Sequence, residues 1–172
     1  RRYERDRPGD LVHVDVKKFG NVPPGGGWKV HGRAATEAGH SALERANRAA
    51  RDARGTGRAG YGYLHAAVDD HSRLAYAEIH DDETAATAIA VLRRAVAWFA
   101  ARGVTVQRVL SDNGSCYRSN LWRETCAELG IAVKKTRPYR PQTNGKVERY
   151  QRTLRDEWGY AKAYRSESAR RN

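Results

Sequence analysis

The sequence predicts an α/β domain in which helices pack against a sheet. Short runs rich in β-branched residues alternate with longer stretches whose apolar residues recur every three or four positions, and these are the patterns of strands and amphipathic helices. The chain has 172 residues, of which 40% are hydrophobic, and that is enough for one compact domain with its own core. We therefore expect a single domain at residues 1–160, followed by a C-terminal tail at 161–172.

Three strands are expected in the first half of the chain. An alternating run at 11–16 follows Pro8-Gly9-Asp10, a turn sequence that marks its start. Two more runs, at 62–68 and 73–79, are joined by Asp69-Asp70-His71-Ser72. This acidic cluster could be interpreted as a metal site. A hairpin turn is the better interpretation, because Asp and Ser form turns readily and strands of plausible length lie on both sides.

A basic, glycine-rich segment at about 20–60 separates the first strand from the second. It contains Pro23-Pro24-Gly25-Gly26-Gly27 and a series of arginines between 45 and 58. The alanine content of 41–54 allows a helix, but the stretch lacks a strong apolar stripe, so disorder is equally compatible with it. The segment can act as a basic arm that follows DNA phosphates or as a solvated loop, and a mixture of the two is the favoured interpretation.

Helices and short strands alternate in the second half. Asp81-Asp82-Glu83-Thr84 places acidic residues at the positive end of a helix that ends at Gly103. Residues 106–110 are expected to form a buried strand, which leads into the turn Asn113-Gly114. The remaining expected elements are a helix at 121–129, a brief strand at 131–133, and a last helix with an apolar stripe of Val147, Tyr150, Leu154 and Trp158.

The charge of the chain indicates its kind of partner. The formal net charge is +12, which exceeds what solubility needs and favours a polyanion such as nucleic acid. An acidic membrane surface is the alternative. No apolar stretch reaches about 18 residues and no signal peptide opens the sequence, so we expect neither a membrane span nor export but a cytoplasmic protein. The spacing of Cys116 and Cys126 does not suit a zinc site, and a disulfide is not expected in that compartment.

Three carboxylates stand out from the predicted elements. Asp112 follows the strand at 106–110, and open α/β sheets place ligands at the carboxyl ends of their strands. An aspartate before a turn is more often a local hydrogen-bonding cap. Asp15 in the first strand and Glu148, one turn into the last helix and off its apolar stripe, shift the interpretation toward a functional site. Between Asp112 and Glu148 lie 35 residues.

The motifs around these carboxylates resemble those of a known family. Asp15 in His-Val-Asp-Val, Asp112 in Ser-Asp-Asn-Gly-Ser, and Glu148 in Pro-Gln-Thr-Asn-Gly-Lys-Val-Glu-Arg are similar to the Asp, Asp-35-Glu catalytic core of retroviral integrases and bacterial insertion-sequence transposases. The resemblance covers about 8–160 and is nearest to the bacterial integrase-core transposases. It implies a ribonuclease-H-like fold with a five-stranded mixed sheet flanked by helices, in which 20–60 is an insertion.

The resemblance also implies metal-dependent chemistry on DNA. Asp15, Asp112 and Glu148 would hold two Mg²⁺ or Mn²⁺ ions, for which carboxylate oxygens are suitable ligands, with Asp15 bridging them. Cleavage at the ends of a DNA element would free a 3′-hydroxyl, which then attacks target DNA. The alternatives are a nuclease of the same fold that does not join strands, and a domesticated DNA-binding module, against which the intact triad argues.

Basic and polar residues near the triad are expected to bind DNA phosphates. Residues 134–141 read as a basic, proline-stiffened loop, and Arg152 and Arg155 follow Glu148 at offsets of four and seven residues on one helix face. The expected DNA-binding residues are Lys17, Lys134, Lys135, Arg137, Arg140, Gln142, Asn144, Lys146, Arg152 and Arg155. By the same resemblance we expect a homodimer or higher homo-oligomer, a bacterial source, and an upstream helix-turn-helix region outside this sequence.

Overall fold

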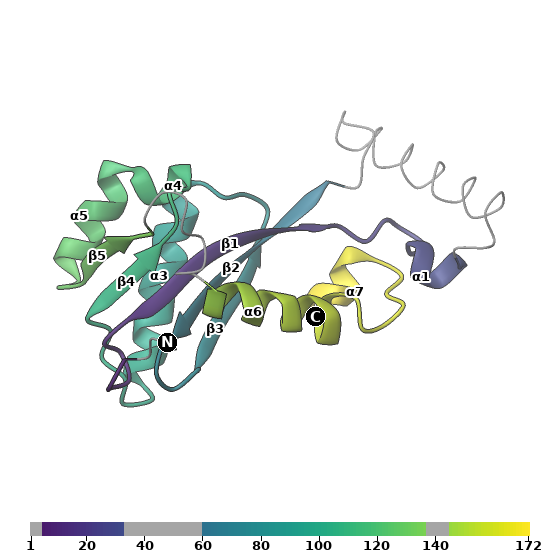
Figure 1. The fold of residues 1–172 in the computed structure, drawn as a ribbon. Coiled ribbons are helices and arrows are strands. Elements are labelled where there is room, and N and C mark those ends of the chain that lie inside the picture. The colour runs from purple at the N-terminus through teal and green to yellow at the C-terminus, as the bar shows by residue number, and fades with distance from the viewer. Residues whose placement is uncertain (1–4, 33–59, 137–144) are drawn as a thin grey trace. The chain divides into compact units, whose positions relative to one another are not determined.

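A computed structural model describes residues 5–32, 60–136 and 145–172 (Figure 1). The chain divides into two compact units. The first unit spans 1–17 and 63–152, and the second spans 18–62 and 153–172. The C-terminal residues therefore group with 18–62, and the expected single domain at 1–160 with a tail at 161–172 stays a prediction.

A five-stranded mixed sheet organises the fold, as the sequence predicts (Figure 1). Strands β2 and β3 form an antiparallel hairpin, whereas β4 runs parallel to both β1 and β5. The spatial order of the strands is β3-β2-β1-β4-β5. Their bounds are β1 Val12–Gly20, β2 Tyr61–Asp69, β3 Ala75–His80, β4 Arg108–Ser111 and β5 Ala132–Lys135.

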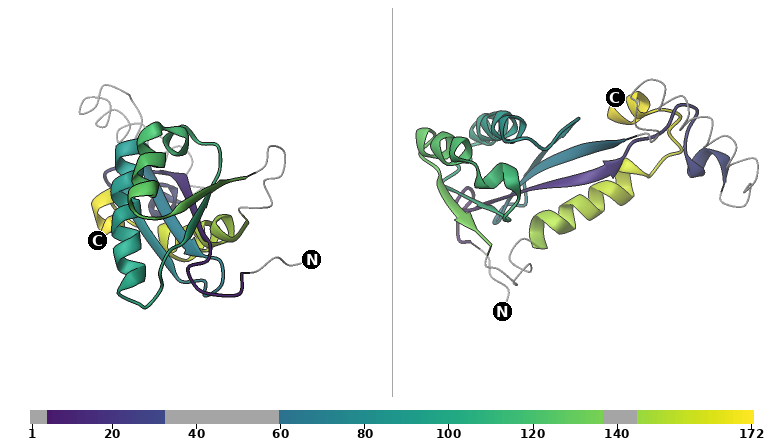
Figure 2. Two further views of the ribbon diagram at one scale, coloured as in Figure 1. Left: turned by 90° about the vertical axis from the view of Figure 1, so that its left-hand side faces the viewer. Right: turned by 90° about the horizontal axis from the view of Figure 1, so that it is seen from above.

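Helices of the first unit cover both faces of its sheet (Figure 2). Their bounds are α3 Ala85–Ala100, α4 Ser115–Arg118, α5 Asn120–Glu128 and α6 Gly145–Leu154. Ala67 of β2 belongs to the core beneath α3 and α5, while its neighbours Ala66 and Val68 pack with Val147 of α6. Successive side chains of a strand point to opposite faces, so β2 serves both layers.

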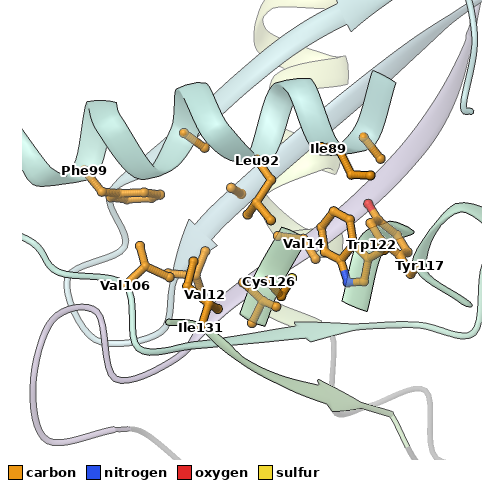
Figure 3. Close-up of a cluster of buried hydrophobic side chains, with 14 of the residues drawn as sticks. Val12, Val14, Ile89, Leu92, Phe99, Val106, Tyr117, Trp122, Cys126 and Ile131 are labelled. Carbon is orange, nitrogen blue, oxygen red and sulfur yellow. The ribbon is translucent and has the colours of Figure 1, made fainter. Parts of the chain in front are cut away.

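The main core lies between the sheet and helices α3 to α5 (Figure 3). Phe99 of α3 and Cys126 of α5 are completely buried there. Trp122 packs edge-on against Tyr117, with their ring centroids 4.9 Å apart. Both cysteines are free and buried in this core, which agrees with the expectation that they form no disulfide.

Helix α3 begins at a hydrogen-bonded cap. The Thr84 hydroxyl accepts from the backbone N–H of Thr87, and the Asp82 carboxylate accepts from the N–H of Thr84 at 2.9 Å. Hydrogen bonds from the Thr87 and Thr84 side chains and the Thr84 backbone lower the pKa of Asp82 to about 2. The predicted acidic residues therefore precede the helix and cap it, and none lies in its first turn.

Several elements differ from the sequence-based expectation. Strand β1 continues to Gly20, and a short helix α1, Trp28–His31, lies within the 20–60 insertion. The helix considered at 41–54 lies outside the described residues. Helix α4 was not predicted because its four residues are too few to show a periodic pattern. The helix that carries Glu148 changes to a π-helical turn at Arg155–Gly159, and α7, Glu167–Arg171, follows.

The second unit contains a buried arginine. Arg170 is 1% exposed. Its guanidinium carbon lies 6.0 Å from the ring centroid of Phe19 and 5.6 Å from that of Tyr160. It also donates to the Gly20 carbonyl at 3.0 Å and pairs with Glu167 at 2.8 Å. These contacts compensate the burial of its charge. Within the described ranges, no helix is long and apolar enough to cross a lipid bilayer.

The outer strand of the hairpin carries an ion pair that should make folding stability depend on pH. Both carboxylate oxygens of Glu78 accept from Arg94, at 2.7 and 2.6 Å, and this contact holds the pKa of Glu78 near 2 against an ordinary value of 4.5. A depressed carboxyl pKa stabilises the fold above the unfolded-state value, and that stability is lost as pH falls through the folded-state value. Because Arg94 is half exposed, solvent screening limits the contribution to about 1 kcal/mol or less.

We therefore expect Glu78→Gln to remove part of the stability lost on acidification from about pH 5 to about pH 3. Urea unfolding of the parent and the variant over this range measures the difference. Glu128→Gln is the control, because the Glu128 pair with Arg93 is exposed on both sides. Equal acid sensitivity of parent and Glu78→Gln would contradict the assignment.

Candidate active site

Two of the three predicted carboxylates come close together because the neighbouring strands β1 and β4 run parallel. In the register of β1 and β4, His13 lies opposite Leu110. Two residues further along each strand, on the same face of the pleat, come Asp15 and Asp112. The sheet thus brings together aspartates that lie almost a hundred residues apart in the sequence. Asp15 is half-buried, and Asp112 is exposed just beyond the end of β4.

The third carboxylate comes from α6, the helix on the face of the sheet opposite α3. Glu148 is exposed in the first turn of α6, whereas its neighbour Val147 is completely buried against β2. The charge of Glu148 reaches Asp15 and raises the pKa of the Asp15 carboxyl. The negative charges of Asp112 and Glu148 therefore both act on the Asp15 carboxyl.

Electrostatics at this place disfavour a full set of ionised carboxylates. Burial, together with the charges of Asp112 and Glu148, raises the pKa of Asp15 to about 6, while a hydrogen bond from the Val16 backbone and the Gln151 side chain oppose the shift. Oxygen donors of this kind suit a hard divalent cation, whose charge would offset their repulsion. Among the described residues, however, no three His, Cys, Asp or Glu side chains gather into a metal-holding cluster. Repulsion between the like charges of the carboxylates disfavours such a cluster when no cation is bound.

The loop after β4 also shows the local role that an aspartate before a turn can have. The Oδ1 atom of Asp112 accepts from the N–H of Gly114 at 2.8 Å. A Cβ atom at Gly114 would lie 3.0 Å from that same oxygen, so a glycine lets the turn close tightly over the carboxylate. Asp112 still has a second carboxylate oxygen with which to act as a ligand.

Gln151 belongs to the site but was not identified from the sequence. It lies one helical turn beyond Glu148, it is 3% exposed, and its side chain lowers the pKa of the Asp15 carboxyl. Its Nε2 atom is buried without a hydrogen-bond partner among the described residues. The available signal was the i, i+4 spacing from Val147, which places a polar residue on the buried face of α6. The predicted stripe instead assigned that face to Tyr150, Leu154 and Trp158, which are only partly buried.

The acidic cluster between β2 and β3 is a hairpin turn, as predicted. Asp69 is completely buried and accepts from the N–H of Gly9 at 2.8 Å, from the N–H of Ser72 at 2.7 Å and from its hydroxyl at 2.6 Å. Hydrogen bonds to backbone and hydroxyl groups satisfy this carboxylate. Asp69 therefore stabilises the turn.

The structure places some of the expected DNA-binding residues beside the aspartates. Lys134 and Lys135 were assigned to a loop, and this is wrong: they are the last residues of β5, because parallel pairing with Leu110 and Ser111 of β4 extends the strand through them. Both lysines are exposed. Lys135 lies opposite the residue that precedes Asp112, so cationic side chains flank the end of β4.

The other expected DNA-binding residues have varied surroundings. Lys17 on β1 and Arg152 on α6 are exposed. Arg155 opens the π-helical turn in the second unit and pairs with Asp156 at 2.8 Å. The amine of Lys146 contacts the buried carboxylate of Asp70. Four of the residues lie outside the described part of the chain, namely Arg137, Arg140, Gln142 and Asn144.

Comparisons of the sequence point to one family. A family model described as integrase core domain matches residues 5–141, and a second model of the same description matches 129–172. The Gag-Pol polyprotein of bovine immunodeficiency virus (strain R29) is 33% identical over 90 residues, which are 52% of this chain and 6% of the polyprotein. The putative transposase InsD for insertion element IS2E of Escherichia coli (strain K12) is 39% identical over 49 residues, or 28% of this chain and 22% of that protein. The chain spans less than a quarter of either relative.

Solved structures share the fold at low sequence identity. A chain of the simian T-cell lymphotropic virus intasome, in complex with PP2A regulatory subunit B56 gamma, matches with a TM-score of 0.66 and 20% identity over 92% of this chain and 43% of its own length. The HTLV-2 integrase catalytic core domain in complex with magnesium matches with a TM-score of 0.57 and 15% identity over 90% of this chain and 72% of its own. The fold is therefore ribonuclease-H-like, as the sequence motifs imply.

Proposed function

This chain belongs to the integrase core domain family, and from that premise we propose that it is the catalytic core of a metal-dependent DNA transposase or integrase. In this proposal it cleaves DNA at the ends of an element and transfers the resulting 3′-hydroxyl strand into target DNA. The observation that carries the proposal is the placement of Asp15 on β1 and of Asp112 just beyond the end of the parallel strand β4, with the charges of Asp112 and Glu148 both acting on the Asp15 carboxyl.

Asp15, Asp112 and Glu148 would hold two Mg²⁺ or Mn²⁺ ions. Their hard oxygen donors fit such ions, and a bound cation would oppose the raised pKa of the Asp15 carboxyl. When bound, paired ions of this kind activate the attacking oxygen and stabilise the leaving oxygen in phosphodiester chemistry. The magnesium complex of the HTLV-2 integrase core supports this choice of metal.

The chain's own residues have separate tasks around the reacting phosphate. Strands β1 and β4 hold two carboxylates on a rigid sheet, and α6 brings the third from outside it. Lys134 and Lys135 at the edge strand β5, with Arg152 on α6, offer charges to the DNA backbone on either side of the carboxylates.

We expect Arg152→Ala to weaken DNA binding by removing one phosphate contact. The slope of log affinity against log salt concentration should fall in magnitude by about 1, with similar losses for different DNA sequences. Arg155→Ala is expected to act in the same way. Binding titrations at several salt concentrations measure this slope. The matched control is Arg93→Ala, an exposed arginine of α3 on the other face of the sheet. An unchanged slope for Arg152→Ala would show that this side chain is only solvated.

A strand-transfer assay tests the function directly. Short duplexes that carry the ends of the encoding element would be incubated with the protein in Mg²⁺ and in Mn²⁺. Joined products support a transposase or integrase. Cleavage without joining would indicate a nuclease of the same fold, and binding alone would indicate a DNA-binding module without catalysis. We further propose a homodimer or higher homo-oligomer, which the dimeric and trimeric forms of the HTLV-2 integrase core support.

A further inference from the structure

The turn between β2 and β3 holds a second aspartate whose contacts reach far beyond the turn. Asp70 is 1% exposed. Its carboxylate accepts from the N–H of Arg5 at 2.7 Å, lies 2.8 Å from Nε2 of His13, and contacts the amine of Lys146. Three segments distant in the sequence therefore meet at one buried carboxylate: the start of the described chain, β1 and α6.

Lys146 is the partner that bears on the candidate active site. It is the second residue of α6, two positions before Glu148, and its amine also donates to the Asp70 backbone carbonyl at 3.1 Å. Val147, between Lys146 and Glu148, is completely buried against Ala66 and Val68 of β2. The first turn of α6 is thus attached to the β2–β3 hairpin by one ion pair and one apolar contact.

The burial of Asp70 gives this ion pair its weight. A carboxylate removed from water is costly unless charged and polar partners compensate it, and loss of one partner leaves the cost in place. The Lys146 side chain remains partly exposed, so its amine loses less hydration than the Asp70 carboxylate does. Asp70 therefore depends on Lys146 to compensate its burial, and this dependence holds the start of α6 in place.

We propose that the Asp70–Lys146 pair is a positioning device that fixes the first turn of α6, and with it Glu148, relative to Asp15 and Asp112. This inference rests on the proposed function and assigns to Lys146 a role other than the DNA contact expected from the sequence. Lys146 touches neither substrate nor reacting atoms in this assignment. It acts through Glu148.

Hydrogen exchange in the variant Lys146→Met tests the attachment. Methionine keeps much of the stem and removes the charge. The backbone amides of 148–151 should then exchange roughly tenfold faster or more, whereas those of α3 and β4 should keep their protection. Lys162→Met, at an exposed lysine of the second unit, is the matched control and should change neither. Unchanged exchange at 148–151 would overturn the proposal.

A double-mutant cycle separates this contact from a general loss of stability. Asp70→Asn should speed the same amides, and Asp70→Asn combined with Lys146→Met should exchange no faster than the faster single variant, because both remove one interaction. Lys146→Arg should retain protection. Additive effects in the double variant would contradict a direct coupling between the two residues. If Asp70→Asn alone does not fold, the comparison of Lys146→Met with Lys146→Arg still decides the matter.

DNA binding and turnover complete the test. With Lys146→Met the salt slope of DNA binding should stay at the parental value, in contrast to Arg152→Ala, and the cleavage rate at saturating DNA should fall about tenfold or more with KM unchanged. A slope reduced by about 1 with normal exchange at 148–151 would show that Lys146 binds phosphate instead. Faster hydrogen exchange at 148–151 with a parental cleavage rate would also overturn the positioning role. The exchange and salt measurements need no catalysis, so they remain informative if the proposed activity itself is absent.

Discussion

Asp112→Asn is expected to abolish DNA cleavage and strand joining, with a loss of more than about a hundredfold in rate. The substitution removes the charge of a metal ligand and keeps its shape. Because the Asp112 side chain is exposed and an amide oxygen can still accept from the N–H of Gly114, the fold and the affinity for DNA should change little. Product formation on element-end duplexes, thermal unfolding and DNA titration measure the three properties.

The same result is expected for the other two carboxylates. Asp15→Asn and Glu148→Gln should each lose both reactions. Glu124→Gln is the matched control, since Glu124 is an exposed carboxylate of α5, and it should keep the parental rate. Strand transfer at about the parental rate by any one of the three triad variants would remove that residue from the metal site.

The largest effect on stability is expected at Phe99. Its ring is completely buried in the core between α3 and the sheet (Figure 3). It also packs edge-on against Trp98, with ring centroids 5.2 Å apart. Phe99→Ala should lower the free energy of unfolding by about 3–5 kcal/mol, because the lost transfer energy is joined by the cost of a cavity. Urea denaturation measures this change.

An exposed position on α5 supplies the control for Phe99. Leu121 is 52% exposed, so Leu121→Ala should change the free energy of unfolding by no more than about 0.5 kcal/mol. Phe99→Leu should cost less than Phe99→Ala, since a smaller cavity remains. A Phe99→Ala protein as stable as the Leu121→Ala protein would show that the core around α3 is not packed as described.

Much of the first unit could be predicted because its signals are local. The strands at 62–68 and 73–79 and the turn between them are encoded by consecutive residues, and the structure confirms the hairpin. The acidic start and apolar face of α3 are equally local. The meeting of Asp15 with Asp112 was expected through the resemblance of motifs, since the sequence alone contains no measure of which strand lies beside which.

The features that escaped prediction depend on partners distant in the chain. The extension of β5 through Lys135 comes from its pairing with β4. Asp70 and Lys146 are 76 residues apart, so neither sequence neighbourhood reveals the other. The buried face of α6 was assigned to aromatic and aliphatic residues, yet at position 151 the fold buries an amide. Whether a polar side chain is buried depends on its contacts in the folded protein, and hydrophobic periodicity does not reveal those contacts.

The buried guanidinium of Arg170 gives the last helix a role in the integrity of the second unit. Its charge stays in place through the carbonyl of Gly20, the carboxylate of Glu167 and the rings of Phe19 and Tyr160. Trimming the chain before Arg170 would uncover those rings and leave Glu167 without this partner. We therefore expect the final residues to unfold together with the segment around Gly20.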